Sequence, residues 1–430
     1  MGMEWSGLQF QRSASQFKKF MLPAVAVLGR CERQKSAAAY VQGLLMPGHR
    51  KSIEPMAQRL GVDTQGLQHF MSSSPWCEKT VWSVIRGQII PHFEPIQAWV
   101  VDETGWIKQG KHSVGVAPQY CGSVGKKANC QVSVEVVVTD GWIAAPIGGR
   151  LYLPEQWIED RARCERAGIP EGVEFATKPM IALEIIQEAL SEGVAPAPVL
   201  ADAVYGDNAD FRAGLKGLGL EFFLQVDAGK HKGWSFEVPT EVKWVRRHPK
   251  PETPPSRTLR EIAAEIPELQ WESVHWKTTG GKEGSTRLAW CEVWLQHGLR
   301  KAGGDLEKLW LVVDWPAGAA EPYHYYLAHL HRAPSKARCL TLSRSRWHIE
   351  QYFQRAKDDL GLDHYEGRSW RGFHHHLVLS VLAYLFILTV HADAKKNFWC
   401  DVGGDPASDP SMAGEIDRLL LLLQHEFYGR

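Results

Sequence analysis

The spacing of hydrophobic residues changes from helical to strand-like near residue 90. Upstream, apolar side chains recur at helical intervals, and downstream come short runs rich in β-branched residues, which are typical of buried strands. The pattern predicts strands at 98–101, 132–138, 142–145, 198–201 and 220–226, and helices at 178–192 and 208–218. Asp140 and Gly141 predict a hairpin turn between the second and third strands.

Three strands followed by helix, strand, helix and strand are the element order of a ribonuclease-H-like α/β core. Residues 91–226 would hold its first part and residues 336–392 its last helices, with residues 393–430 as a C-terminal tail and helix. The interval 227–335 alternates in the manner of strands and is rich in tryptophan, so we expect a mainly β insertion with one helix near 259–266. Its tryptophans are expected mostly in the core, although one or two could stack on an unpaired base.

Residues 1–90 are predicted to be helical and are locally basic. Between residues 10 and 60 the chain has nine lysines and arginines against two glutamates. Residues 52–63 and 64–71 have the order of a helix-turn-helix, with Gly61 at the turn and a second helix that could enter a major groove. Two amphipathic helices in an ordinary helical domain would have the same pattern, so both interpretations stay open.

Composition narrows the class of protein without identifying a partner. The 430 residues are 44% hydrophobic and 23% charged, which is ordinary for a globular chain with two or three domains. Lysine plus arginine and aspartate plus glutamate both number 49, so any nucleic-acid binding must come from local clustering of charge. Eight scattered cysteines without metal-ligand spacing indicate a reducing cytoplasm, and residues 1–20 lack the pattern of a signal peptide. The apolar run 377–390 is short for a bilayer span and predicts a buried core helix.

Three carboxylates lie at positions that two-metal chemistry requires. Asp102 ends the strand run 98–101, Asp202 ends the run 198–201, and Glu350 lies near the start of a predicted helix. Cleavage of a phosphodiester with two metals needs divalent cations about 4 Å apart on oxygen ligands, one for the attacking and one for the leaving oxygen. Acids at the ends of two strands and on one helix can meet around such a pair.

The helix that carries Glu350 has the sharpest local pattern. Arg346 lies four residues before Glu350 and Lys357 seven residues after it, so all three fall on one helical face. A metal-binding carboxylate would thus be flanked by two phosphate-binding cations. Taken alone, Arg346 and Glu350 could equally be a plain helical ion pair.

With these motifs the chain resembles the DDE-type transposases of bacterial insertion sequences that have a Y-x2-R-x3-E-x6-K signature around the last acid. Arg346, Glu350 and Lys357 match that spacing, while Ser343 occupies the tyrosine position. The surroundings of Asp102 and Asp202 also look like the first and second acid motifs of that family. The resemblance covers residues 21–390.

The resemblance implies a ribonuclease-H-like fold with a β insertion, and Mg²⁺ or Mn²⁺ as cofactor with two ions per site. It implies double-stranded DNA with terminal inverted repeats as substrate, and a homodimer acting on two ends. Asp102, Asp202 and Glu350 would be the catalytic metal ligands. The cations expected to contact DNA are Arg346, Lys357, Arg355, Arg368, Arg50 and Lys51. A cytoplasmic, nucleoid-associated protein that does not enter membranes is expected.

Other polar residues are discounted as ligands. Three consecutive histidines, 374–376, would point in three directions on a helix and make a poor metal site. Asp207, Asp314 and Glu103 are rival acids, and Glu103 is expected on the opposite face of the strand from Asp102. Tyr205 and its neighbour Gly206 are expected to shape the turn after Asp202.

Two other functions remain open on sequence alone. One is a catalytically silent DNA-binding regulator that keeps the fold, and the other is a structure-specific nuclease of the same fold. All three acids are present in the chain, which disfavours the regulator. Short inverted repeats flanking the coding region would favour the transposase.

Overall fold

The N-terminal region of the computed structural model consists of five helices. The structure describes residues 7–239, 244–245, 248–249, 254–277, 283–296 and 306–402, so most of the predicted tail at 393–430 lies outside the described residues. The five helices are α1 (Gly7–Ala26), α2 (Cys31–Leu45), α3 (Ile53–Leu60), α4 (Thr64–Ser72) and α5 (Glu78–Val84). A π-helical turn (Ile85–Ile89) and a 3₁₀ turn (Ile90–Phe93) lead into the sheet.

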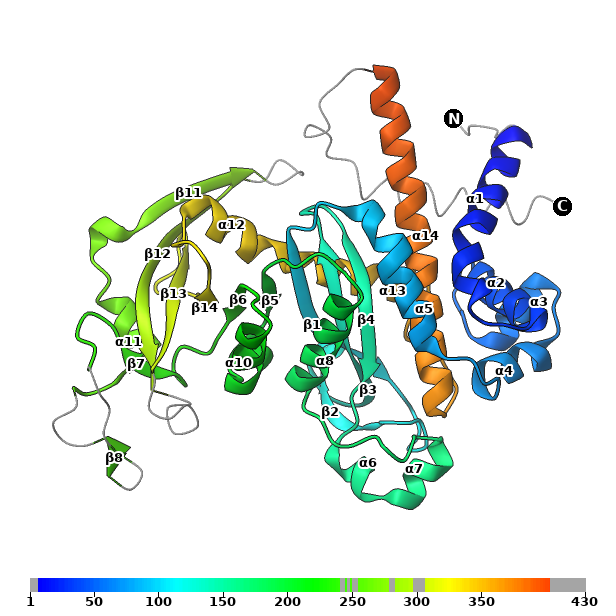
Figure 1. The fold of residues 1–430 in the computed structure, drawn as a ribbon, viewed down its shortest axis with the longest axis horizontal. Helices are drawn as coiled ribbons and strands as arrows, with labels where there is room; N and C mark the ends of the chain where they lie inside the picture. The colour runs from blue at the N-terminus through cyan, green and yellow to red at the C-terminus, as the bar shows by residue number, and fades with distance from the viewer. Residues whose placement is uncertain are drawn as a thin grey trace.

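The two helices expected at 52–71 are present as α3 and α4. Gly61 ends α3 with a left-handed φ of 65°, and Asp63 caps α4 by accepting hydrogen bonds from the Gln65 and Gly66 amides. Leu67 and Phe70 on the inner face of α4 are buried. The N-terminal helices thus form a packed unit with α14, and they lie beside it in Figure 1.

A single mixed sheet of twelve strands runs through the molecule. Its main path has the order β10-β7-β12-β13-β14-β6-β5-β1-β3-β2, with β4 paired to β3 and β11 paired to β12. The strands of the first half are β1 (Ala98–Ile107), β2 (Ala117–Cys121), β3 (Lys126–Thr139), β4 (Ala144–Leu151), β5 (Val199–Ala201) and β6 (Phe222–Gln225). Strand β1 is antiparallel to β3 and parallel to β5, and β5 is parallel to β6.

The predicted strands and helices of this half agree with the structure. Helices α8 (Lys178–Ser191) and α10 (Ala209–Gly217) follow the strands in the expected order, with short helices α6 (Glu155–Glu159), α7 (Arg161–Ala167) and α9 (Ala203–Gly206) between them. At the β3–β4 hairpin, Asp140 accepts the amides of Trp142 and Ile143, and Gly141 has a φ of 94°. The chain is therefore a mixed α/β protein, as the sequence predicted.

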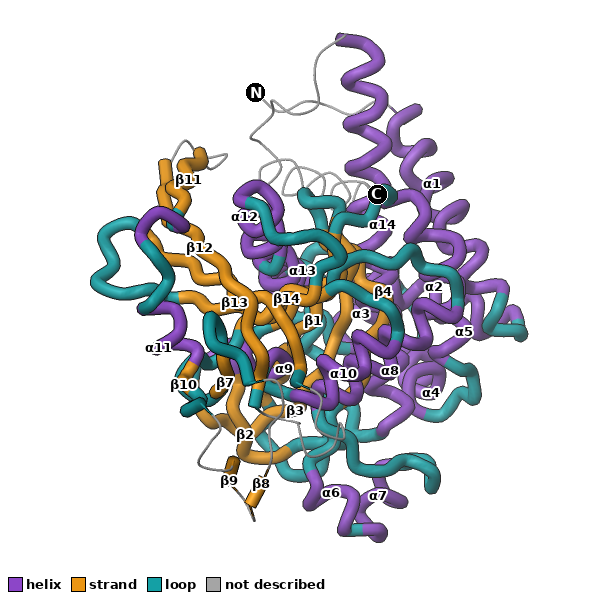
Figure 2. The backbone as a smooth tube through the Cα atoms, turned by 60° about the vertical axis from the view of Figure 1, so that its left-hand side comes forward, coloured by secondary structure: helices purple, strands orange, loops and turns teal. Residues whose placement is uncertain are grey.

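The predicted insertion continues the same sheet instead of forming a separate body. It holds β7 (Lys232–Trp234), β10 (Arg257–Thr258), β11 (Glu272–Lys277), β12 (Glu283–Leu295), β13 (Glu307–Pro316), β14 (His324–His329) and helix α11 (Leu259–Ala264). A two-stranded sheet of β8 (Trp244–Val245) and β9 (His248–Pro249) accompanies it. Strand β14 pairs antiparallel with β6 and so joins the two halves. Figure 1 shows these strands and the N-terminal helices at opposite ends of the molecule, and Figure 2 shows the strands running from β11 and β12 on the left toward the helices α1, α2, α5 and α14 on the right.

Three helices close the described chain: α12 (Lys336–Ser345), α13 (Trp347–Asp358) and α14 (Trp370–Val402). One stretch of α14, Trp370–Val390, is long and apolar enough to cross a membrane, but 89% of its most apolar window is buried inside the protein. Residues 377–388 are all buried, so the prediction of a core helix is confirmed.

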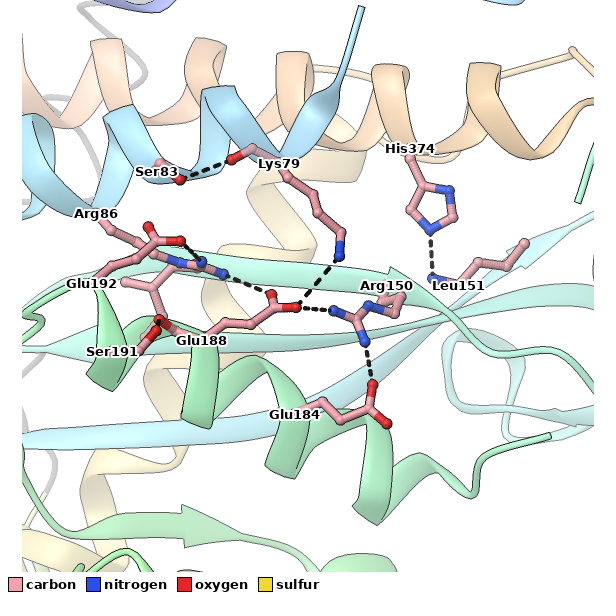
Figure 3. Close-up of polar contacts among 11 residues, drawn as sticks. Lys79, Ser83, Arg86, Arg150, Leu151, Glu184, Glu188, Ser191, Glu192 and His374 are labelled. Atoms are coloured by element: carbon pink, nitrogen blue, oxygen red, sulfur yellow. Dashed lines mark hydrogen bonds and ion pairs between the residues drawn. The ribbon is translucent and has the colours of Figure 1, made fainter. Parts of the chain in front are cut away.

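A network of ion pairs fastens the N-terminal helices to the sheet (Figure 3). The Glu188 carboxylate on α8 forms ion pairs with Lys79 of α5 at 3.7 Å, with Arg86 at 3.6 Å and with Arg150 of β4 at 2.8 Å. Arg86 also binds Glu192 at 3.0 Å, and its side chain is only 3% exposed. One carboxylate on α8 thus links the helical region to the edge of the sheet.

Candidate active site

Two of the predicted acids are neighbours because of strand pairing. The parallel register of β1 and β5 sets Val101 beside Ala201, so Asp102 and Asp202 are the next residues on adjacent strands. Asp202 caps α9, and its Oδ1 accepts the Val204 amide at 2.9 Å. Asp102 does not end its strand as predicted, because β1 continues to Ile107, whereas Asp202 follows the last residue of β5 and begins the turn into α9.

Arg346 connects the third acid to the first. Its Nη1 lies 3.4 Å from Asp102 Oδ2, and its Nη2 lies 2.5 Å from Glu350 Oε1. Arg346 is the N-cap residue of α13, at the break after α12, so its guanidinium reaches Asp102 on β1 while Glu350 lies one turn along the helix. The structure therefore brings together Asp102, Asp202, Glu350 and Arg346, four residues that the sequence singled out.

The acids carry more negative charge than the site neutralises. Burial, followed by the charge of Asp202, raises the pKa of Asp102 to about 8, and Arg346 acts in the opposite direction. Burial and the charge of Glu103 likewise raise the pKa of Asp202. Each cause penalises the ionised carboxylate, so a bound cation would relieve the repulsion.

The donor chemistry of the site fits a hard divalent cation. Carboxylate oxygens are the ligands that Mg²⁺ and Mn²⁺ prefer. Within the described ranges, no group of three or more histidine, cysteine, aspartate or glutamate side chains is already gathered closely enough to hold a metal ion. Arg346 instead bridges two of the three acids.

Glu103 turns to the other face of β1, as expected from strand alternation. Its Oε1 accepts from Lys178 Nζ at 2.6 Å and its Oε2 from the Tyr205 hydroxyl at 2.8 Å. Tyr205 is fully buried in α9, directly after Asp202. Sequence reasoning treated Tyr205 as a turn residue and did not anticipate this contact.

Glu135 is a fully buried carboxylate that sequence reasoning missed. It lies on β3 opposite Asp102 and accepts from the Tyr352 hydroxyl at 2.7 Å and from Ser133 Oγ at 2.8 Å. Burial raises the pKa of Glu135 to about 7, although both hydrogen bonds act to lower it. A lone glutamate within the valine-rich run 132–138 was the available signal.

The expected DNA-contacting cations are placed differently from one another. Lys357 Nζ donates to the Gly105 carbonyl at 2.8 Å, and burial lowers the pKa of this lysine. Arg355 is partly exposed on α13, and Arg368 is exposed before α14. Lys357 is thus tied to the strand that carries Asp102.

Arg50 and Lys51 do not contact the acids. Arg50 pairs with Glu366 at the surface. Lys51 is only 4% exposed, and its ammonium donates to the carbonyls of Leu44 at 2.8 Å and of Met46. Its charge thus caps the end of α2 from inside the protein, and the contact of Lys51 with DNA stays a prediction.

The discounted residues are engaged elsewhere. Histidines 374–376 are buried, and each ring is hydrogen-bonded to a group on another segment, such as the Leu151 amide, the Met71 carbonyl and the Tyr40 hydroxyl. Asp207 binds His231 and Lys230, and buried Asp314 accepts from Thr286. Ser343, at the expected tyrosine position, donates to the Leu340 carbonyl at 3.0 Å.

Comparisons with known proteins identify related sequences. Residues 24–283 match the family described as DDE superfamily endonuclease, a range that contains Asp102 and Asp202 and ends before Glu350. A probable transposase for insertion sequence element IS701 from Microchaete diplosiphon is 30% identical over 187 residues. The matched segment is 41% of this chain and 44% of the relative. The chain therefore matches less than half of the relative's length.

Proposed function

The chain belongs to the DDE superfamily of endonucleases, and from this premise we propose that it is a DNA transposase that cleaves and transfers DNA strands at element ends. The observation that carries the proposal is the Arg346 bridge, which joins Glu350 on α13 to Asp102 beside Asp202. The name of the relative, a probable transposase, supports the same function.

The core of the proposed enzyme is ribonuclease-H-like. The spatial order β4-β3-β1-β5-β6, with β3 antiparallel to β1 and the last three strands parallel, supports this assignment. Residues 91–226 and 336–392 then form the core, and residues 227–335 are a β-rich insertion into it.

Asp102, Asp202 and Glu350 would hold Mg²⁺ or Mn²⁺, two ions per site. When bound, such cations activate the attacking oxygen and stabilise the leaving oxygen of a phosphodiester. Arg346 pairs with both Glu350 and Asp102 and so links the two acids. Its guanidinium is also the nearest cation to the acids for a DNA phosphate to meet.

The proposed reaction has two displacements at phosphorus. Water first attacks the phosphate at an element end, the bond to the 3′ oxygen breaks, and a free 3′-hydroxyl results. That hydroxyl then attacks a second phosphodiester and joins the element to its target. Neither step requires a covalent link between protein and DNA.

Recognition of the ends is assigned to the N-terminal helices. Gln65, Gln68 and His69 on α4 are exposed while Leu67 and Phe70 face the core, so the outer face of α4 is free to enter a major groove. The partner would be double-stranded DNA with terminal inverted repeats, bound by a homodimer. Such an enzyme would work in the cytoplasm at the nucleoid.

Incubation of the purified chain and Mg²⁺ with DNA that spans the flanks of its gene tests the activity. We expect nicks at the element ends followed by joined products, and neither in Asp202→Asn, which should still bind DNA. Undiminished nicking by Asp202→Asn would overturn the site. Nicks without joining would indicate a structure-specific nuclease, and binding without nicks a silent regulator.

A second experiment tests recognition by α4. Gln68→Ala should weaken binding to element ends by about 1–3 kcal/mol and relax the sequence preference, because one base contact is lost. Gln58→Ala, an exposed glutamine on α3, is the matched control and should change the sequence preference little. Equal effects of both variants, compared at one salt concentration, would move recognition away from α4.

A further inference from the structure

The turn that carries the second acid is tied to the strand that carries the first. Tyr205 follows Asp202 by three residues and is fully buried, and its amide bonds back to the Asp202 carbonyl at 3.2 Å. Its hydroxyl donates to Glu103 at 2.8 Å, and Glu103 is the residue after Asp102 on β1. This hydrogen bond therefore joins the turn that follows Asp202 to the residue next to Asp102 on β1.

The helix that carries the third acid is tied to the sheet in a similar way. Tyr352 follows Glu350 by two residues, is fully buried, and donates to Glu135 at 2.7 Å. Glu135 is the partner of Asp102 in the β1–β3 register. The bond therefore fixes α13 against the strand next to that of Asp102.

The two bonds lie on opposite faces of the sheet. Residues 102 and 103 alternate in direction along β1, and Glu135 shares the face of Asp102 because the two are directly opposed. Each glutamate has a second donor that fixes its orientation: Lys178 for Glu103 and Ser133 for Glu135. Ser133 itself accepts from Trp106 Nε1 at 3.1 Å.

We propose that Tyr205 and Tyr352 are positioning residues, which limit how far Asp202 and Glu350 can move from Asp102, so that a divalent cation can draw the three acids together. The inference rests on the proposed function of this site. Glu350 is 46% exposed, and buried Ile349 and Phe353 pack its helix against the protein. The Tyr352 hydroxyl adds a bond from this helix to buried Glu135, and the Tyr205 hydroxyl adds one to half-buried Glu103 on the other face.

Tyr205→Phe and Tyr352→Phe test the inference, because each removes one hydroxyl and keeps the ring. Binding of Mn²⁺ to the full chain without DNA, followed by electron paramagnetic resonance, should weaken about 10-fold or more in either variant. Cleavage should then need correspondingly more Mn²⁺, while affinity for DNA ends stays unchanged. Circular dichroism checks that each variant is folded.

Tyr40→Phe is the matched control. It removes a buried tyrosine hydroxyl that bonds His376 at 2.8 Å, far along the chain from the acids, and should leave Mn²⁺ binding unchanged. Glu135→Gln keeps an oxygen that can accept from Tyr352 and should bind Mn²⁺ within a few-fold of the parent, whereas Glu135→Ala should resemble Tyr352→Phe. If Tyr352→Phe does not fold, Mn²⁺ binding by Tyr205→Phe, Glu135→Gln and Glu135→Ala tests the inference instead.

The outcomes separate the inference from the proposed function. If the parent cleaves DNA and both tyrosine variants bind Mn²⁺ as Tyr40→Phe does, the positioning role is wrong and the transposase stands. If the parent binds Mn²⁺ without cleaving DNA, and the tyrosine variants lose that binding, the positioning role stands and the function is wrong. A parent that binds no Mn²⁺ overturns both.

Discussion

Two carboxylates, one in each half of the sheet, have pKa values shifted in opposite directions. In the insertion half, Glu307 at the start of β13 binds Arg212 at 3.0 Å and Lys216 at 3.1 Å. Burial alone would raise the pKa of Glu307, but these two cations lower it overall. In the acid-bearing half, Asp102 shares a single arginine with Glu350 and lies beside Asp202, and its pKa is raised to about 8.

The difference indicates that Glu307 has a structural role, whereas Asp102 is available to bind a cation. Two cations fully compensate Glu307, so its charge stabilises the fold. The charge at Asp102 is compensated only in part, and such a site costs stability until a cation arrives. Incomplete compensation therefore distinguishes Asp102, a candidate metal ligand, from Glu307.

The largest expected effect comes from removing the charge of Asp102. Asp102→Asn should lower the cleavage rate by roughly a thousandfold or more, or about 4 kcal/mol of transition-state stabilisation. The free energy of unfolding without metal should not fall, because the lost charge was poorly compensated. Nicking assays and urea denaturation measure the two quantities, and a large loss of stability would contradict the comparison.

The next effect is a dependence of stability on pH through Glu135. The folded pKa of about 7 lies above the ordinary 4.5, so the stability from the neutral form is fully present below about 4.5 and is lost as pH rises through 7. Glu135→Gln stays neutral, so relative to the parent it should gain up to about 3 kcal/mol between pH 4.5 and 8.

Urea denaturation in EDTA at several pH values measures this gain. The other titratable groups near this carboxylate or its strand are Asp102, Lys357 and Tyr352, and they are present in both proteins. Their own titration therefore largely cancels in the difference in stability between variant and parent. A stability difference between variant and parent that does not change with pH would contradict the raised pKa of Glu135.

A smaller and opposite effect is expected for the compensated acid. Glu307→Gln removes the partner of Arg212, whose side chain is fully buried, and should lower the free energy of unfolding by about 2 kcal/mol. Thermal denaturation would show the loss. Unlike Asp102→Asn, this variant should retain Mn²⁺ binding, and unchanged stability would mean that Glu307 is not the structural acid described above.

The smallest effect is expected at the surface of the insertion half. Lys308 pairs with Glu292 at 2.7 Å, with side chains 54% and 36% exposed. Lys308→Gln should change stability by less than about 1 kcal/mol, since solvent screens exposed pairs. A larger loss in thermal denaturation would show that surface pairs in this half matter as much as buried ones.

Periodicity was sufficient to predict most local elements of the first half of the sheet, but it does not report long-range partners. The run before Asp202 is a short buried strand, whereas the run before Asp102 continues to Ile107, and alternation along that strand places Glu103 on the far face. The contact of Glu135 with Tyr352 joins residues more than two hundred positions apart, and neither residue stands in a motif. The pairing of β14 with β6, which merges the insertion into the sheet, is equally remote in sequence.

The count of charged residues in the sequence was least informative about where each charged side chain points. Lys51 contributes to a basic N-terminal cluster, yet its ammonium binds carbonyls at the end of α2 inside the protein. Arg346 contributes to a helical motif, and its guanidinium does reach the acids. Sequence alone cannot separate these cases, because the direction of a long side chain depends on which acceptors the fold leaves nearby.

Helix α8 touches both ends of the proposed machinery. Its first residue, Lys178, binds Glu103 next to Asp102, and Glu188 near its last turn receives the cations of α5 and β4. Fourteen residues of α-helix span about 21 Å as a stiff rod. A shift of the N-terminal helices against the sheet would therefore move Glu188 at one end of α8. Because the helix is stiff, the same movement along its axis would reach Lys178 at the other end and displace Glu103, the residue beside Asp102.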